Sequence, residues 1–122
     1  MTEPRLQFLY VFTPGERPDL GHDPGAWTDA DSLIADQHFA HLELGAADGI
    51  VLLAGRSQDW LGPAIVILEV DSEEQARAFM AEDPFVSSGL FGADLHPFRI
   101  ALGGSPQSSV TSQTRPDPRS PR

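Results

Sequence analysis

The stretch at residues 63–70 (PAIVILEV) carries large apolar side chains on both faces of the strand that it predicts. Ile65 and Ile67 would point to one face, and the alternate residues Val66 and Leu68 to the other. A strand that is apolar on both faces needs a cover on each side of its sheet. This strand therefore belongs near the centre of a sheet, and other parts of the protein, or a partner, must cover both of its faces.

Strand composition recurs in three other segments: residues 6–12, 50–54 and 96–102. Helices are expected at residues 28–47 and 72–83, since each segment opens with a Thr or Ser cap and is followed by Gly or Pro. The resulting order is β-α-β-β-α-β. It predicts an α+β, ferredoxin-like fold, with a four-stranded antiparallel sheet and two helices on one face.

Two helices cover one face of such a sheet and leave the apolar other face to be covered. A second copy of the same sheet is the simplest cover, so we expect a homodimer that packs through the sheets. The alternative is a cover within the monomer. Residues 14–27 hold three Pro and three Gly, and this long loop, with Trp27, could fold over the open face.

The charge balance excludes some partners. Residues 1–102, which we expect to form the domain, hold 17 acidic residues against 5 Arg, a formal net charge of −12. Such a surface repels phosphate backbones and anionic lipids, so neither nucleic acid nor a membrane is an expected partner. Residues 103–122 are rich in Pro, Ser and Arg and predict a disordered tail. The chain has no cysteine and no evident signal segment, so we expect a cytoplasmic protein.

The candidate for chemistry is a pair formed by His38 and Asp83. His38 lies on the apolar stripe of the first helix, between Ile34 and Leu42, and Asp83 extends the inward stripe of the second. Both helices pack on the same sheet face, so an imidazole can meet a carboxylate there. The carboxylate would orient the ring and leave the other nitrogen to move a proton. Alternatively, Asp83 caps its own turn and His38 is a satisfied core histidine.

Three further residues are candidates for substrate binding: Arg56, Ser87 and Tyr10. Arg56 could bind an anionic substrate or be a solvated turn residue. Ser87 follows Asp83 closely but could equally solvate a helix end. No cofactor is expected. A metal site remains a weaker alternative, with these ligands: His38, His41, Asp83, His96 and His22.

Several motifs together resemble the YCII-related (YciI-like) family over about residues 6–102. They are the first-helix segment ADQHFAHL at residues 35–42, the turns Asp48-Gly49 and Ala54-Gly55, the helix start SEEQA at residues 72–76, and Asp83-Pro84-Phe85 followed by Gly89-Leu90. The chain departs from the family pattern at Arg56, where members often have Pro, and in its longer loop at residues 14–27.

The resemblance implies a ferredoxin-like domain that dimerises through its sheets, similar to muconolactone isomerase. It also implies an active site at His38 and Asp83, with lyase or isomerase chemistry on a small ring-derived metabolite. If the domain is such an enzyme, we expect the loop at residues 14–27 to act as a lid over the substrate. Two alternatives stay open: a ligand-binding domain without turnover, and a structural dimer module. The enzyme requires a cavity that reaches one nitrogen of His38, whereas the structural module requires none.

Overall fold

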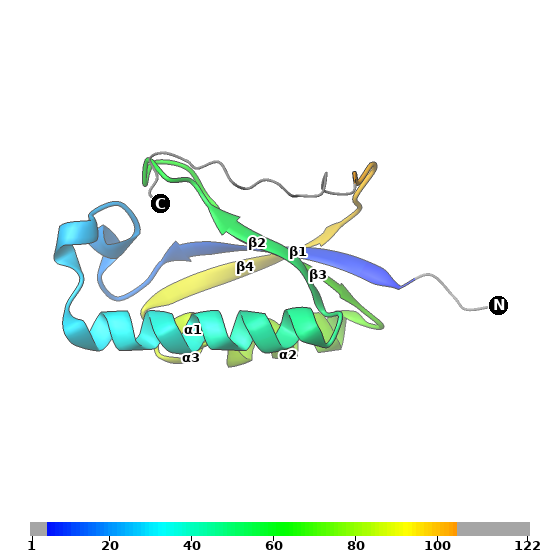
Figure 1. The fold of residues 1–122 in the computed structure, drawn as a ribbon, viewed down its shortest axis with the longest axis horizontal. Coiled ribbons are helices and arrows are strands. Elements are labelled where there is room, and N and C mark those ends of the chain that lie inside the picture. Colours follow the sequence, from blue (N-terminus) through cyan, green and yellow to red (C-terminus); the bar gives the residue numbers. More distant parts are fainter. Residues whose placement is uncertain (1–4, 105–122) are drawn as a thin grey trace.

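A computed structural model describes residues 5–104, and their strands form one antiparallel sheet in the order β2-β3-β1-β4. The strands are β1 (Leu6–Pro14), β2 (Val51–Arg56), β3 (Ala64–Val70) and β4 (Phe91–Phe98). The helices α1 (Asp29–Ala47), α2 (Glu73–Glu82) and α3 (Pro84–Ser87) all lie on one face of the sheet (Figure 1). The predicted α+β class and ferredoxin-like order are confirmed. Residues 105–122 of the predicted tail lie outside the described residues.

The core lies between this helix layer and the sheet. Strand β3 contributes Val66, Leu68 and Val70 to it, and β1 contributes Phe8 and Tyr10, all of them buried. The register places Tyr10 opposite Val66 and Phe8 opposite Leu68, so these side chains form adjacent cross-strand pairs on one face. No helix within residues 5–104 is long and apolar enough to cross a membrane.

Both long helices begin where their caps predict. Thr28 and Asp31 form a capping box at the start of α1, each side chain accepting a hydrogen bond from the other residue's backbone N–H. At α2 the Ser72 hydroxyl accepts from the Gln75 N–H at 3.2 Å. The expected return bond from Gln75 to Ser72 is replaced by one to the N–H of Asp71, at 2.8 Å.

The last strand lies earlier in the chain than predicted. β4 starts at Phe91 rather than His96, and it pairs with β1 from Pro14↔Phe91 to Gln7↔Phe98. Gly92 and Asp94 interrupt the apolar pattern, which hides the strand in the sequence. Strand pairing along nearly the whole length of β1 outweighs the low strand propensity of Gly92 and Asp94.

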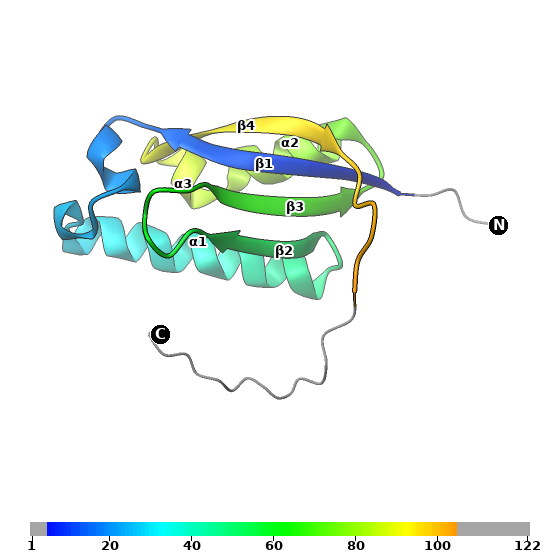
Figure 2. The ribbon, with the colours of Figure 1, turned by 90° about the horizontal axis from the view of Figure 1, so that it is seen from above.

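No helix of the described residues covers the second face of the sheet in the monomer, and we call it the open face (Figure 1). Leu53, Ile67 and Leu9 form one cross-strand row on it; Leu53 is 48% exposed, whereas Ile67 at the centre of the row is 7% exposed. Figures 1 and 2 show the short helices η1 (Pro18–Gly21) and η2 (Pro24–Ala26) at the end of the sheet, beside the start of α1. The loop at residues 14–27 therefore does not cover this face, and the monomer alternative for its cover is wrong.

Candidate active site

Asp83 occupies the single-residue junction between α2 and α3. Pro84 disfavours helical backbone at the residue before it, and Asp83 accordingly has extended backbone angles (φ −62°, ψ 124°). Its side chain turns back, and Oδ1 accepts a hydrogen bond from the Phe85 N–H at 3.0 Å. The carboxylate is fully buried, at 0% exposure. A buried carboxylate needs further hydrogen-bond donors, and α1 and β1 each supply one.

The donor from α1 is the imidazole of His38. Its Nδ1 lies 2.7 Å from Oδ1 of Asp83, and its side chain is 14% exposed. The ring stacks on Phe85, with centroids 3.9 Å apart and an interplanar angle of 16°. The Phe12 ring packs edge to face with the imidazole, with ring centroids 5.5 Å apart. Because a carboxylate oxygen accepts, Nδ1 carries the hydrogen of the neutral ring. Within residues 5–104, no protein group hydrogen-bonds Nε2, which is left for a ligand.

The donor from β1 is the hydroxyl of Tyr10, which lies 2.8 Å from Oδ2 of Asp83. Tyr10 is fully buried, at 0% exposure. Burial, together with the negative charge of Asp83 and the hydrogen bond to it, raises the pKa of Tyr10 far above its ordinary value. The phenol therefore stays protonated and remains a donor. Asp83 thus accepts hydrogen bonds from three donors, which fix its position and that of the His38 ring.

A pocket of about 790 Å³ opens beside His38. It lies between α1, the ends of β2 and β3, and the loop at residues 14–27. Aromatic side chains line much of it: Phe12, Trp27, Phe39, Trp60, Phe85 and Phe91. Arg56, His22 and His38 also line it, whereas none of the described Asp or Glu residues does. The pocket suits a small planar ligand and presents no carboxylate to repel an anion.

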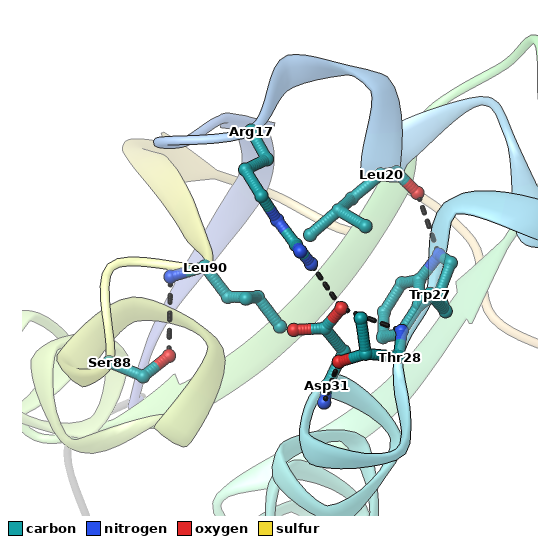
Figure 3. A network of polar contacts seen from close by, with 7 residues as sticks. All are labelled: Arg17, Leu20, Trp27, Thr28, Asp31, Ser88 and Leu90. Carbon is teal, nitrogen blue, oxygen red and sulfur yellow. Dashed lines mark hydrogen bonds and ion pairs between the residues drawn. The ribbon is translucent and has the colours of Figure 1, made fainter.

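The loop at residues 14–27 contributes Pro18, Leu20 and Trp27 to the pocket lining, and polar contacts hold it to the start of α1 (Figure 3). The Arg17 guanidinium forms an ion pair with Asp31, the buried cap residue of α1. The indole N–H of Trp27 donates to the Leu20 carbonyl at 3.0 Å. The N–H of Thr28, aided by Arg17, holds the pKa of the Asp31 carboxyl below its ordinary value. The loop position is therefore coupled to the same carboxylate that caps the helix carrying His38.

The sequence matches the model of one known protein family. The YCII-related domain matches residues 11–95. The chain belongs to the YCII-related family. The match includes His38, Arg56 and Asp83 and begins one residue after Tyr10. No curated protein sequence matches the chain.

One solved structure similar to this YCII-related domain is 5-chloro-2-hydroxyhydroquinone dehydrochlorinase (TftG) from Burkholderia phenoliruptrix AC1100, in complex with 2,5-dihydroxybenzoquinone. The two chains are 18% identical, and the TM-score is 0.53. The likeness covers 75% of this chain and 93% of the other. At this level of identity it shows the shared fold.

The residues that the sequence singled out in this YCII-related domain fall into three groups. His38, Asp83 and Tyr10 form one hydrogen-bonded cluster, and Arg56 lines the pocket next to it. Tyr10 is fully buried and does not line the pocket. Ser87 is exposed at the end of α3 and is also not part of the pocket lining.

The geometry of the histidines bears on the metal alternative. His41 places Nε2 3.0 Å from the Phe79 carbonyl and stacks on the Phe79 ring, so it serves the packing of α1 on α2. His38 directs Nδ1 to Asp83 instead. Among the described residues, no group of three or more His, Cys, Asp or Glu side chains is arranged to hold a metal ion.

The aromatic wall of the pocket was not predicted from the sequence. Trp27 contacts the rings of Trp60, Phe85 and Phe91, with centroids between 6.0 and 6.4 Å apart. These residues come from the long loop, the turn between β2 and β3, α3 and β4. The signal available was the two Trp residues in Gly- and Pro-rich loops, since a large aromatic in such a loop usually packs against something.

Proposed function

We propose that this domain is an acid–base enzyme of lyase or isomerase type that acts on a small, ring-derived metabolite. One observation carries the proposal: His38 has one ring nitrogen held by a fully buried carboxylate, 2.7 Å away, while the ring borders an aromatic pocket. This arrangement meets the requirement for a general base, namely a fixed ring with one nitrogen available to a ligand.

In this proposal Nε2 of His38 removes a proton from a ring C–H or O–H that a neighbouring carbonyl acidifies. The electron pair left behind either expels a leaving group, as in a lyase, or is protonated again at another position by the same imidazolium, as in an isomerase. The imidazolium that forms is paired with Asp83 throughout. Asp83 and Tyr10 act as positioning residues, since neither of them lines the pocket.

The choice of a ring-derived substrate is supported by the pocket walls and by the similar fold of TftG, a dehydrochlorinase whose structure contains 2,5-dihydroxybenzoquinone. Planar rings gain stacking and edge contacts from aromatic walls. The proposed proton transfer uses protein groups alone and invokes no cofactor. We place the reaction in the cytoplasm, an environment with which the lack of cysteine is compatible.

Proton transfer can be tested without knowing the full reaction. A panel of hydroxyquinones, chlorinated hydroquinones and unsaturated lactones is incubated with the protein in D2O, and deuterium uptake and product formation are followed by NMR. We expect at least one panel member to exchange or react, and His38→Gln to reduce that rate by about 10²- to 10⁴-fold. His96→Gln is the matched control, because His96 is exposed and outside the pocket lining.

Equal rates in the His38→Gln variant and the native protein would refute the catalytic role. If panel members bind but none reacts or exchanges, the non-catalytic binding module accounts for the pocket. The structural module is the least favoured of the three, because a pocket does lie beside His38.

We further propose that the domain forms a homodimer through its open sheet face. The support is the apolar row of Leu53, Ile67 and Leu9 across three adjacent strands, which no helix covers in the monomer. Packing this row against a second copy removes its exposed apolar surface, chiefly that of Leu53, from water on both partners.

A further inference from the structure

Arg56 is one of two arginines in residues 5–104 without an ion pair, and of these two it alone lines the pocket. Residues 5–104 hold 16 acidic side chains and five arginines. Three of the five form ion pairs, in the couples Arg5–Asp71, Arg17–Asp31 and Arg77–Glu73. Arg56 forms no ion pair with any described residue, although carboxylates are abundant. Its hydrogen bonding is limited to the Ser57 carbonyl, at 3.3 Å, so most of its N–H donors are free.

The strand register directs Arg56 toward the pocket. Ala54 pairs with the core residue Val66, and Arg56 pairs with Ala64 two residues further along. Side chains two residues apart in a strand share a face, so Arg56 lies on the helix side of the sheet, the side that carries His38. Both residues line the same pocket.

The neighbouring carboxylate is held away from this arginine. Oδ1 of Asp59 accepts from the Ser57 hydroxyl at 2.6 Å and from the Leu61 N–H at 2.9 Å. The hydrogen bond from Ser57 and the backbone bonds also lower the pKa of Asp59, so that carboxylate remains ionised within its own turn. The charge of Arg56 is thus left unneutralised at the mouth of the pocket.

Trp60 holds the guanidinium in place. The Arg56 guanidinium carbon lies 4.0 Å from the centre of the Trp60 ring, a cation–π contact. Trp60 has a positive φ of 66°, which is unfavourable for a bulky side chain and persists where surrounding contacts impose it. Its ring also meets Trp27 edge to face, at 6.4 Å. The strained turn therefore fixes a planar cation beside an aromatic wall.

We propose that Arg56, held over Trp60, selects ligands whose planar ring carries an anionic oxygen group, either a carboxylate or an ionised ring hydroxyl. This inference rests on the proposed function for the identity of the pocket as the substrate site and adds the charge class of the substrate. The ring lies against the aromatic wall near His38, and the anionic oxygens accept hydrogen bonds from the guanidinium.

The test uses calorimetric titration with two pairs of probes, each an anion and its neutral methyl derivative. The pairs are 2,5-dihydroxybenzoate with its methyl ester, and 4-nitrophenolate with 4-nitroanisole. We expect the native protein to bind at least one anion about 10-fold or more tighter than its neutral partner. The pair with the larger preference shows whether the site reads a carboxylate or a ring oxyanion.

The Arg56→Gln variant should lose this preference while still binding the neutral probes. Arg99→Gln, which removes the same charge at an exposed position outside the pocket lining, should keep it. Near-ultraviolet circular dichroism checks that both variants are folded. The proposal is overturned if native protein binds neither anion, if it binds anion and neutral probe equally, or if Arg56→Gln retains the preference.

Running the same titrations on His38→Gln separates this inference from the proposed function. Suppose that the native protein transfers a proton to or from no panel member, while both it and His38→Gln prefer the anionic probes. Catalysis would then be refuted, and the role of Arg56 would stand. If proton transfer depends on His38 but the titrations show no anion preference, the role of Arg56 would be refuted and catalysis would stand.

Discussion

Replacing Tyr10 with Phe tests the hydrogen-bond cluster that positions His38. The substitution removes one oxygen atom from a fully buried position, where the hydroxyl donates to Oδ2 of Asp83 at 2.8 Å. Within the described chain no other group donates to Oδ2, whereas Oδ1 keeps His38 and Phe85. A hydrogen bond to a charged acceptor contributes about 1.5 to 3 kcal/mol, so the free energy of unfolding should fall by about that amount at neutral pH.

The assay is urea denaturation followed by circular dichroism. With a slope of about 1.5 kcal/mol per molar urea, the expected loss moves the midpoint down by about 1 to 2 M. The Tyr10→Phe change is then repeated in Asp83→Asn. Because both residues belong to one hydrogen bond, the double-mutant cycle should give a coupling energy of about 1 kcal/mol or more. A loss below about 0.5 kcal/mol with no coupling would refute the reasoning.

The same residue predicts a pH dependence. Because the folded-state pKa of Tyr10 is raised, its contribution to stability is complete below the unfolded pKa of about 10 and is lost progressively above it. The chain has one tyrosine, so tyrosinate absorbance reports on Tyr10 alone. We expect that absorbance to appear together with alkaline unfolding. Tyrosinate formed near pH 10 in a protein that is still folded would contradict this.

Three further outcomes are expected. Gly45→Ala should destabilise the fold by about 1 to 3 kcal/mol in urea, because a Cβ there would lie 2.6 Å from a phenylalanine ring of α2; a neutral effect would show that the helices can separate at no cost. Asp31→Asn should be less stable than the native chain at pH 7, and the difference in stability should close as the pH falls below about 4, since the Asp31 pKa is lowered in the fold. Arg17→Gln should show a smaller loss with the same pH dependence. A stability difference that does not change with pH would exclude the Asp31 carboxylate as its cause. Leu53→Glu should convert the proposed dimer to monomer in analytical ultracentrifugation, whereas Leu44→Glu, which changes a more exposed leucine on α1, should not; an unchanged mass in Leu53→Glu would exclude this interface.

Helical periodicity was sufficient to bring His38 and Asp83 to the same layer. Each lies on the apolar stripe of its helix, and the β-α-β-β-α-β order places both helices on one sheet face. The alternative that Asp83 caps its own turn is also realised, because Oδ1 accepts from both the Phe85 N–H and His38. Both arrangements therefore occur at one carboxylate, which accepts hydrogen bonds from several donors.

Contacts that depend on strand register and loop path could not be predicted in the same way. Tyr10 and Asp83 are 73 residues apart, and their bond depends on where β1 lies relative to the end of α2. A phenol on the inward face of a strand and a carboxylate on an inward helix stripe each require a polar partner, which was the available signal. The start of β4 was missed because Gly92 and Asp94 have low strand propensity.

The tautomer of His38 tests the central claim most directly. Nitrogen chemical shifts of the ring, measured by NMR as the pH is raised until they no longer change, distinguish hydrogen on Nδ1 from hydrogen on Nε2. Our account predicts hydrogen on Nδ1, held by Asp83, with a weaker preference in Asp83→Asn. Hydrogen on Nε2 in the native protein would leave no free base facing the pocket and would contradict the proposed role of His38.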